Sequence, residues 1–157
     1  MQRAGDGGDD LGSRVIAGRL VDVAMHLGFL LCRQWAPYFK WRGTLFARLP
    51  LDPAVGQALG QVLRADDWHA RGVHLASALE SLAAHQRRTG LPSVMPVAVP
   101  FWDRPYLHVD PHLVPQLFDG IDDPRVRALP PGLGSIEQRT DNVDVLMHPA
   151  RRRAALG

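Results

Sequence analysis

The chain has 157 residues, of which 46% are apolar, 22% charged and 7% aromatic, and its formal net charge is +2. That length suits one domain that folds without a disulfide or a metal, and the composition excludes an intrinsically disordered chain. Cys32 is the single cysteine, which excludes an intramolecular disulfide and a cysteine-based zinc site.

The sequence also argues against membrane and nucleic-acid partners. The most continuous apolar stretch, residues 15–32, contains Arg19, Asp22 and His26, whereas a spanning helix needs about 20 nearly uncharged residues. The start is acidic and glycine-rich, unlike a secretory signal, so we expect a cytoplasmic protein. The one dense basic run, residues 151–153, has no interleaved aromatic residues and is typical of a solvated helical turn.

The N-terminal part of the chain predicts a short tail and a long helix. Residues 1–12 contain four Gly and three Asp, which predict a flexible tail, and Ser13 is the expected N-cap. Pro37 is expected to end the helix near Trp35. Apolar residues at steps of three and four predict its buried face: Ile16, Leu20, Val23, Leu27 and Leu30.

Three further helices are expected, over residues 38–49, 54–64 and about 67–88. Asp66 or Asp67 is the expected cap of the last of these, and Gly90 lies where a C-terminal cap is expected. The buried stripe predicted for this last helix is Trp68, Leu75, Leu79, Leu82 and Gln86.

The remaining third of the chain is rich in proline. Residues 91–107 carry prolines at positions 92, 96, 100 and 105, so we expect an extended strap that packs across the helices through Phe101 and Trp102. Short helices are expected after Asp110 and Asp123, followed by a loop at 130–134. A last helix is expected to begin near Thr140 or Asp141 and to be interrupted at Pro149.

The expected fold class is therefore all-α. It is a bundle of roughly six helices with a Pro-rich extended segment, and residues 13–157 form a single domain.

The clearest candidate site is the segment APYFKWRGT, residues 36–44. Tyr38, Lys40 and Trp41 place a phenol, an ammonium and an indole within about one helical turn. A cation beside aromatic faces and helix-start N–H groups suits a phosphate or a carboxylate, and we expect Lys40 to face an open cleft. The alternative is that Phe39 and Trp41 belong to the core and Lys40 extends from the surface.

Two weaker candidates lie further along the chain. Glu137 and Asp141 could supply a general base or bind a cationic acceptor, although the sequence favours helix capping by Asp141 and an ion pair with Arg139. Arg104 could bind a ligand phosphate, or pair with Asp103 and hold the strap in place.

The sequence favours neither a metal site nor a cysteine nucleophile. His108, Asp110 and His112 alternate along the chain, but Pro111 intervenes and a third strong ligand is not evident. Cys32 lies among the apolar residues of the long helix, where a packed thiol is expected. We therefore predict no metal ligands and no catalytic residues.

Three segments resemble DUF4037, a helical domain of unknown function. They are residues 12–49 with the motif APYxKWxGTxFxRL, residues 99–109 (VPFWDRPYLHV) and residues 133–146 (LGSIEQRTDNVDVL). Together the resemblance covers roughly residues 12–148.

The resemblance implies a role beside a catalytic domain. This domain is typically the C-terminal half of proteins whose N-terminal half resembles an aminoglycoside nucleotidyltransferase, where paired carboxylates bind two Mg²⁺ around a nucleoside triphosphate. By that likeness, Lys40 would contact a nucleotide phosphate, while Tyr38 and Trp41 would line the cleft.

The chain departs from the catalytic pattern of that superfamily, which requires Gly-Ser followed by Asp-x-Asp on a strand. After Gly12–Ser13, Asp22 is followed by Ala24 in place of the second acid. After Gly134–Ser135, Asp141 and Asp144 are three residues apart and suit a helix. We therefore expect a chain that is not catalytic alone.

The resulting expectation is the helical half of a nucleotidyltransferase-like protein, which shapes nucleotide and acceptor binding. The chain alone is expected to bind no cofactor, with ATP and Mg²⁺ entering only with a catalytic partner domain. The expected partners are that catalytic domain or a second copy in a homodimer, and a nucleotide or other small ligand. The alternatives are a standalone binding or interaction module for a small anionic ligand, or a non-functional truncated remnant.

An exposed apolar face on the first helix would favour a missing domain or a dimer partner. A closed surface with a concave pocket around Lys40 would favour the standalone module.

Overall fold

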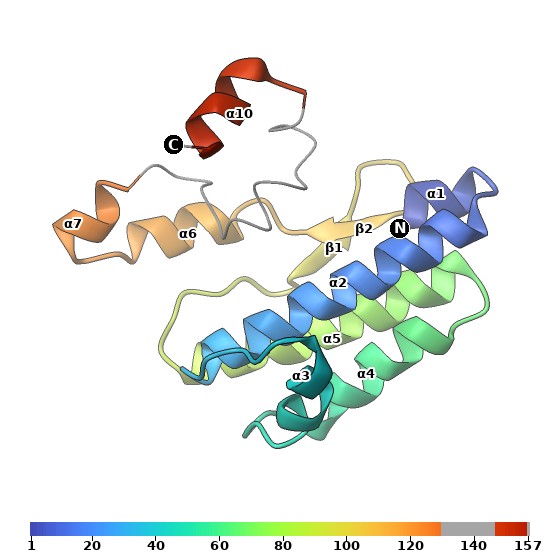
Figure 1. Cartoon of the computed structure of the whole chain (residues 1–157), viewed down its shortest axis with the longest axis horizontal. Coiled ribbons are helices and arrows are strands. Elements are labelled where there is room, and N and C mark those ends of the chain that lie inside the picture. Colours follow the sequence, from blue (N-terminus) through green and yellow to red (C-terminus); the bar gives the residue numbers. More distant parts are fainter. Residues whose placement is uncertain (130–146, 157) are drawn as a thin grey trace. The chain divides into compact units, whose positions relative to one another are not determined.

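The computed structural model describes residues 1–129 and 147–156, and these are mostly helical, which confirms the all-α class (Figure 1). In chain order the elements are α1 (Gln2–Asp6), α2 (Asp10–Leu31), α3 (Phe39–Phe46), α4 (Pro53–Arg64), α5 (Trp68–Arg88), β1 (Ala98–Pro100), β2 (Leu107–Val109), α6 (Leu113–Asp119), α7 (Pro124–Arg127) and α10 (Pro149–Leu156). The chain divides into two compact units, Met1–Gly120 and Ile121–Gly157, whereas we expected one domain over 13–157.

Residues 1–12, expected as a flexible tail, instead form α1 and the start of α2. The Asp9 carboxylate accepts a hydrogen bond from the Gly12 N–H at 2.8 Å and caps α2. Gly5 lies so close to the side chain of Trp68 on α5 that a Cβ atom would clash. The glycine that indicated flexibility therefore permits close packing, and Ser13 is a buried residue within α2 rather than its cap.

The buried face of α2 differs from the predicted stripe. The buried residues are mainly small and recur at helical spacing: Ser13, Ala17, Val21, Ala24, Gly28, Phe29 and Leu31. Three of the predicted stripe residues, Ile16, Val23 and Leu30, are exposed. Small side chains bring α2 close to its neighbours, so its larger apolar residues lie beside the contact.

The second helix ends at Leu31, earlier than the expected Trp35. Arg33 has a positive φ of 53°, its N–H donates to Leu30 O at 2.9 Å, and the Gln34 N–H donates to Phe29 O at 2.9 Å. These two bonds form a Schellman motif that satisfies the terminal carbonyls. Glycine usually occupies the positive-φ position of this motif, whereas here that residue is Arg33. The sequence therefore did not reveal where the helix ends.

Helices α2, α4 and α5 run side by side (Figure 1). The short connection between α4 and α5 makes them antiparallel, and Asp67 caps α5 by accepting from the Ala70 N–H at 2.8 Å. Ser13 meets Arg71 near the start of both α2 and α5, and Cys32 meets His85 near their ends, so these two helices are parallel.

The core of the first unit lies between α2, α3, α4 and α5. Phe29 of α2 and Phe46 of α3 meet edge to face, with ring centroids 6.1 Å apart. The α4 and α5 residues that complete the core are Val55, Ala58, Leu59, Val62, Ala78 and Leu82. A smaller cluster joins Ala83 of α5 to Val94 and Val97 of the strap.

The Pro-rich segment is extended, as expected, and also forms an antiparallel hairpin of β1 and β2, in which Val99 pairs with His108. Glu80 of α5 holds β1, because its Oε1 accepts from the N–H groups of Val97 at 2.6 Å and Ala98 at 3.0 Å. Trp102 does not pack across the helices as expected. It lies at the turn of the hairpin with a positive φ of 55° and is exposed.

In the second unit, Asp123 caps α7 through the Arg125 N–H at 2.8 Å. Pro149 is the first residue of α10 rather than an interruption. The expected loop at 130–134 and the helix start near Thr140 lie outside the described residues. No helix within residues 1–129 or 147–156 is both long and apolar enough to cross a membrane.

Candidate functional site

The segment that begins α3 is held in place by a half-buried ion pair. Arg42 of α3 pairs with Asp22 of α2, and its Nε and Nη2 each donate to Pro37 O at 3.2 Å. Its guanidinium also lies 4.4 Å from the ring centroid of Phe39. Arg42 therefore fixes the 32–38 loop and the first turn of α3 against α2.

Around this anchor, large aromatic side chains face solvent. The exposed fractions are 96% for Trp35, 75% for Phe39, 64% for Tyr38 and 47% for Trp41. Lys40 is exposed as well, and its Nζ lies 5.4 Å from the centroid of the Trp41 ring. We call these five residues the aromatic–cationic surface.

In the sequence, the charged residues that flank this surface are all basic. No acidic residue occurs between Asp22 and Asp52, whereas Arg33, Lys40 and Arg48 all lie there beside the paired Arg42. In the described part of the chain, no carboxylate pairs with Lys40. The arrangement suits an anionic group with an adjoining flat or apolar part.

The structure brings together only part of the predicted site. Tyr38, Lys40 and Trp41 share the start of α3, with Tyr38 as its N-cap residue. Arg104 is exposed in the hairpin turn, and Glu137 and Asp141 lie outside the described residues. The alternative in which Phe39 and Trp41 belong to the core is wrong, because both are exposed.

Lys40 does not line the larger cavity of the first unit, although we expected it to face a cleft. This cavity has a volume of about 580 Å³ and lies between α2, α3 and α4. Its lining is mainly apolar and includes Met25, Phe46, Leu59 and Leu63. A second cavity of about 220 Å³, lined by Leu20, Leu79 and Leu107, lies beside the hairpin and does not include Lys40 either.

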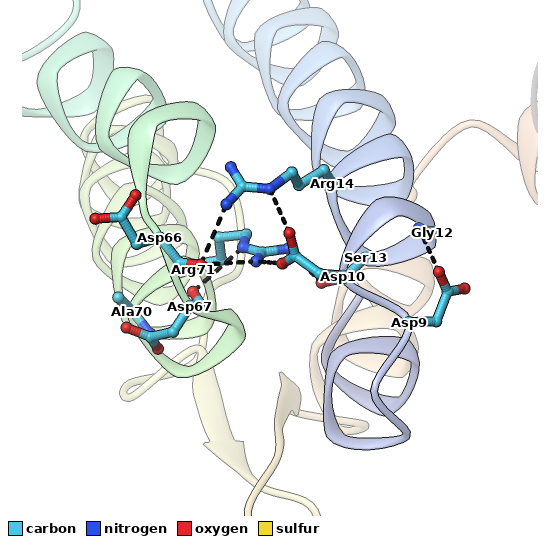
Figure 2. Close-up of polar contacts among 9 residues, drawn as sticks. All are labelled: Asp9, Asp10, Gly12, Ser13, Arg14, Asp66, Asp67, Ala70 and Arg71. Atoms are coloured by element: carbon cyan, nitrogen blue, oxygen red, sulfur yellow. Dashed lines mark hydrogen bonds and ion pairs between the residues drawn. The ribbon is translucent and has the colours of Figure 1, made fainter.

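A buried arginine, which sequence reasoning missed, joins α2 to α5 (Figure 2). Arg71 is only 1% exposed. Its Nη1 donates to Ser13 Oγ at 2.6 Å, its Nη2 binds the Asp10 carboxylate, and its Nε donates to Asp67 O at 3.2 Å. Burial of a guanidinium is tolerated when its donors are satisfied in this way.

The signal for Arg71 was present in the predicted stripe of α5. That stripe steps from Trp68 directly to Leu75, and Arg71 occupies the missing position on the same face. Exposed Arg14 shares the same acid, with its Nε 2.7 Å from Asp10 Oδ2. Hydrogen bonds from Arg14 and then from Arg71 lower the pKa of Asp10 below its usual value.

Cys32 and two of the histidines each contact one potential ligand side chain. Cys32 Sγ lies 3.9 Å from His85 Nε2, and burial raises the pKa of the Cys32 thiol. His112 Nδ1 lies 2.7 Å from Asp110 Oδ1. Among residues 1–129 and 147–156, no three His, Cys, Asp or Glu side chains are grouped so that they could hold a metal ion.

Comparison with known proteins gives one match. No curated protein and no solved structure matches the chain. Residues 1–42 match the family model described as "Domain of unknown function (DUF4037)". The matched residues include α1, α2, the 32–38 loop and the whole aromatic–cationic surface. The resemblance to this family is therefore confirmed over residues 1–42.

Proposed function

We propose that this chain is a helical accessory domain of a nucleotidyltransferase-like protein and contributes a ligand-binding surface to it. The aromatic–cationic surface contacts the nucleotide, with Lys40 at a phosphate and with Tyr38 and Trp41 against its flat part. The observation that carries the proposal is the exposure of four aromatic side chains within seven consecutive residues, beside a lysine that contacts the Trp41 ring and that no carboxylate neutralises in the described chain.

Physical chemistry supports this assignment. An exposed ammonium without a carboxylate partner attracts phosphate oxygens, and neighbouring rings provide faces on which a base can stack. The Arg42–Asp22 ion pair fixes the first turn of α3 before a ligand arrives, which lowers the entropy cost of binding.

The exposed apolar residues of α2 favour an accessory domain over a standalone module. Val15, Val23 and Leu30 face solvent along this helix, and Lys40 lines neither cavity. Large apolar side chains exposed along one helix support a surface that contacts another protein. The catalytic acids would then belong to the partner domain, which would also hold Mg²⁺.

Calorimetric titration of ATP with Mg²⁺ into the full chain tests the proposal. The wild type should release heat on binding, Lys40→Ala should lose most of that heat, and Lys40→Arg should retain part of it because the charge remains. Arg87→Ala, which removes an exposed cation at the end of α5, is the matched control and should bind as the wild type does. Equal heats from the wild type and Lys40→Ala would remove Lys40 from the phosphate-binding role.

A further inference from the structure

The larger cavity lies beside a second surface that the proposed function does not use. Helix α4 forms one wall of this cavity through Gly56, Leu59, Gly60 and Leu63. Gly56 is exposed, and a Cβ atom built on it would meet nothing within 4 Å. Leu63 is exposed at 53% although it is a large apolar residue.

The two ends of α4 carry opposite charges that form no ion pair within the described residues. Asp52 caps the helix, with its Oδ1 accepting from the Ala54 N–H at 2.9 Å. Arg64 lies in the last turn, and its guanidinium extends back over Gly60. Within the described chain neither residue forms an ion pair, and both are exposed.

These residues share one helical row. Asp52, Gly56, Gly60 and Arg64 follow each other at steps of four, which is the row that interdigitates when two helices cross at about −50°. Both the Asp52–Arg64 pair and the Gly56–Gly60 pair are centred on position 58. A two-fold axis at the level of Ala58 therefore places Gly56 against Gly60 of a second copy and Asp52 against its Arg64.

We propose that the chain forms a two-fold symmetric homodimer through α4, with the apolar wall of the cavity at its centre and an Asp52–Arg64 ion pair at each end. The charge pattern is self-complementary, as an interface between identical surfaces requires. Gly56 has open space where a side chain would lie, whereas the Arg64 guanidinium covers Gly60. In the dimer Arg64 turns from Gly60 toward Asp52 of the other copy, which lets the two helix backbones approach, and Leu63 finds apolar partners on the other copy. This interface does not depend on the proposed nucleotide contact, because it uses α4 rather than the start of α3.

Sedimentation velocity of the full chain over a range of concentrations tests the dimer. The wild type should sediment as a dimer, and Gly56→Leu should raise the dimer dissociation constant at least about tenfold because its side chain separates the helices. Gly18→Leu is the matched control, since Gly18 of α2 also has nothing within 4 Å of a built Cβ, and it should remain a dimer. Circular dichroism would confirm that both variants fold.

Charge exchange tests the ion pairs separately. Arg64→Glu should weaken the dimer, because it places two acids at each end, and the double variant Asp52→Lys/Arg64→Glu should restore it. A wild type that stays monomeric would overturn the proposal, as would a dimer that Gly56→Leu leaves intact. A monomer whose 1-anilinonaphthalene-8-sulfonate fluorescence is lost in Gly56→Leu would overturn it in favour of a small apolar ligand in the cavity.

Discussion

Arg71 shows how a single residue joins the two parallel helices of the first unit. Its guanidinium is almost fully buried and binds the Ser13 hydroxyl, the Asp10 carboxylate and the Asp67 carbonyl. Removal of a buried cation costs more than its net contribution, because its former partners lose their hydrogen bonds.

Arg71→Met should therefore lower the free energy of unfolding by about 3 kcal/mol. The methionine fills part of the space but leaves the buried Ser13 hydroxyl without its donor. Arg14→Met is the control, because Arg14 binds the same Asp10 from the exposed side and should change stability little. Urea denaturation of both variants measures the difference, and equal effects would contradict a dominant role for the buried arginine.

The same cluster predicts a pH dependence. The two arginines lower the folded-state pKa of Asp10 below the unfolded value, so folding favours the ionised carboxylate. The resulting stability is present above the unfolded pKa of about 3.9 and is lost as the pH falls through the folded pKa. Asp10→Asn should therefore show a smaller loss of stability than the wild type between neutral pH and pH values below about 4. If urea denaturation gave the same pH dependence of stability for both proteins, the pairing of Asp10 with the two arginines would be contradicted.

At the scale of elements, α2 shows why a helical period alone does not identify the buried face. Ile16, Val23 and Leu30 recur at helical spacing and were predicted to be buried, yet the contact uses Ala17, Ala24 and Gly28. Close approach of two helices favours small residues, and a pattern that weighs side chains by hydrophobicity ranks these below leucine or isoleucine.

Substitution of two glycines in α2 tests which face of this helix is buried. Gly18→Ala should stabilise the protein by about 1 kcal/mol, because the helix gains propensity and a built Cβ meets nothing within 4 Å. Gly28→Ala should destabilise it by about 1–3 kcal/mol, because its Cβ would lie 2.6 Å from Phe46 Cε2 and 3.0 Å from Leu51 Cδ1. Thermal unfolding of both variants provides the comparison. If both substitutions stabilised the protein, Gly28 would not belong to the buried face of α2.

Helix starts were more predictable than ends or strand pairing. Asp67 before α5 and Asp123 before α7 act as caps as expected, because capping is a local interaction between neighbouring residues. The end of α2 was missed because Arg33 adopts a positive φ, which the sequence does not predict for an arginine. The hairpin was missed because β1 is held by Glu80, a contact between residues distant in sequence.

At the scale of the whole chain, the candidate site was predictable only in part. Tyr38, Lys40 and Trp41 were found because they are close in sequence, and in the structure all three are exposed, with Lys40 Nζ 5.4 Å from the centroid of the Trp41 ring. The ion pair of Arg42 with Asp22 was not foreseen, because it joins two helices. The cleft expected at Lys40 was not found in either cavity, since the larger one is lined in α3 by Gly43 and Phe46 and not by Lys40.

The four tryptophans provide the most direct test of the proposed ligand surface. Trp35 and Trp41 belong to it, whereas Trp102 is exposed on the hairpin and Trp68 packs against Gly5 and Tyr106. In an NMR titration of the full chain with ATP and Mg²⁺, the indole N–H signals of Trp35 and Trp41 should shift with saturation. Those of Trp68 and Trp102 should stay in place. An unchanged Trp41 signal, or a Trp102 signal that shifts equally, would contradict the proposed ligand surface.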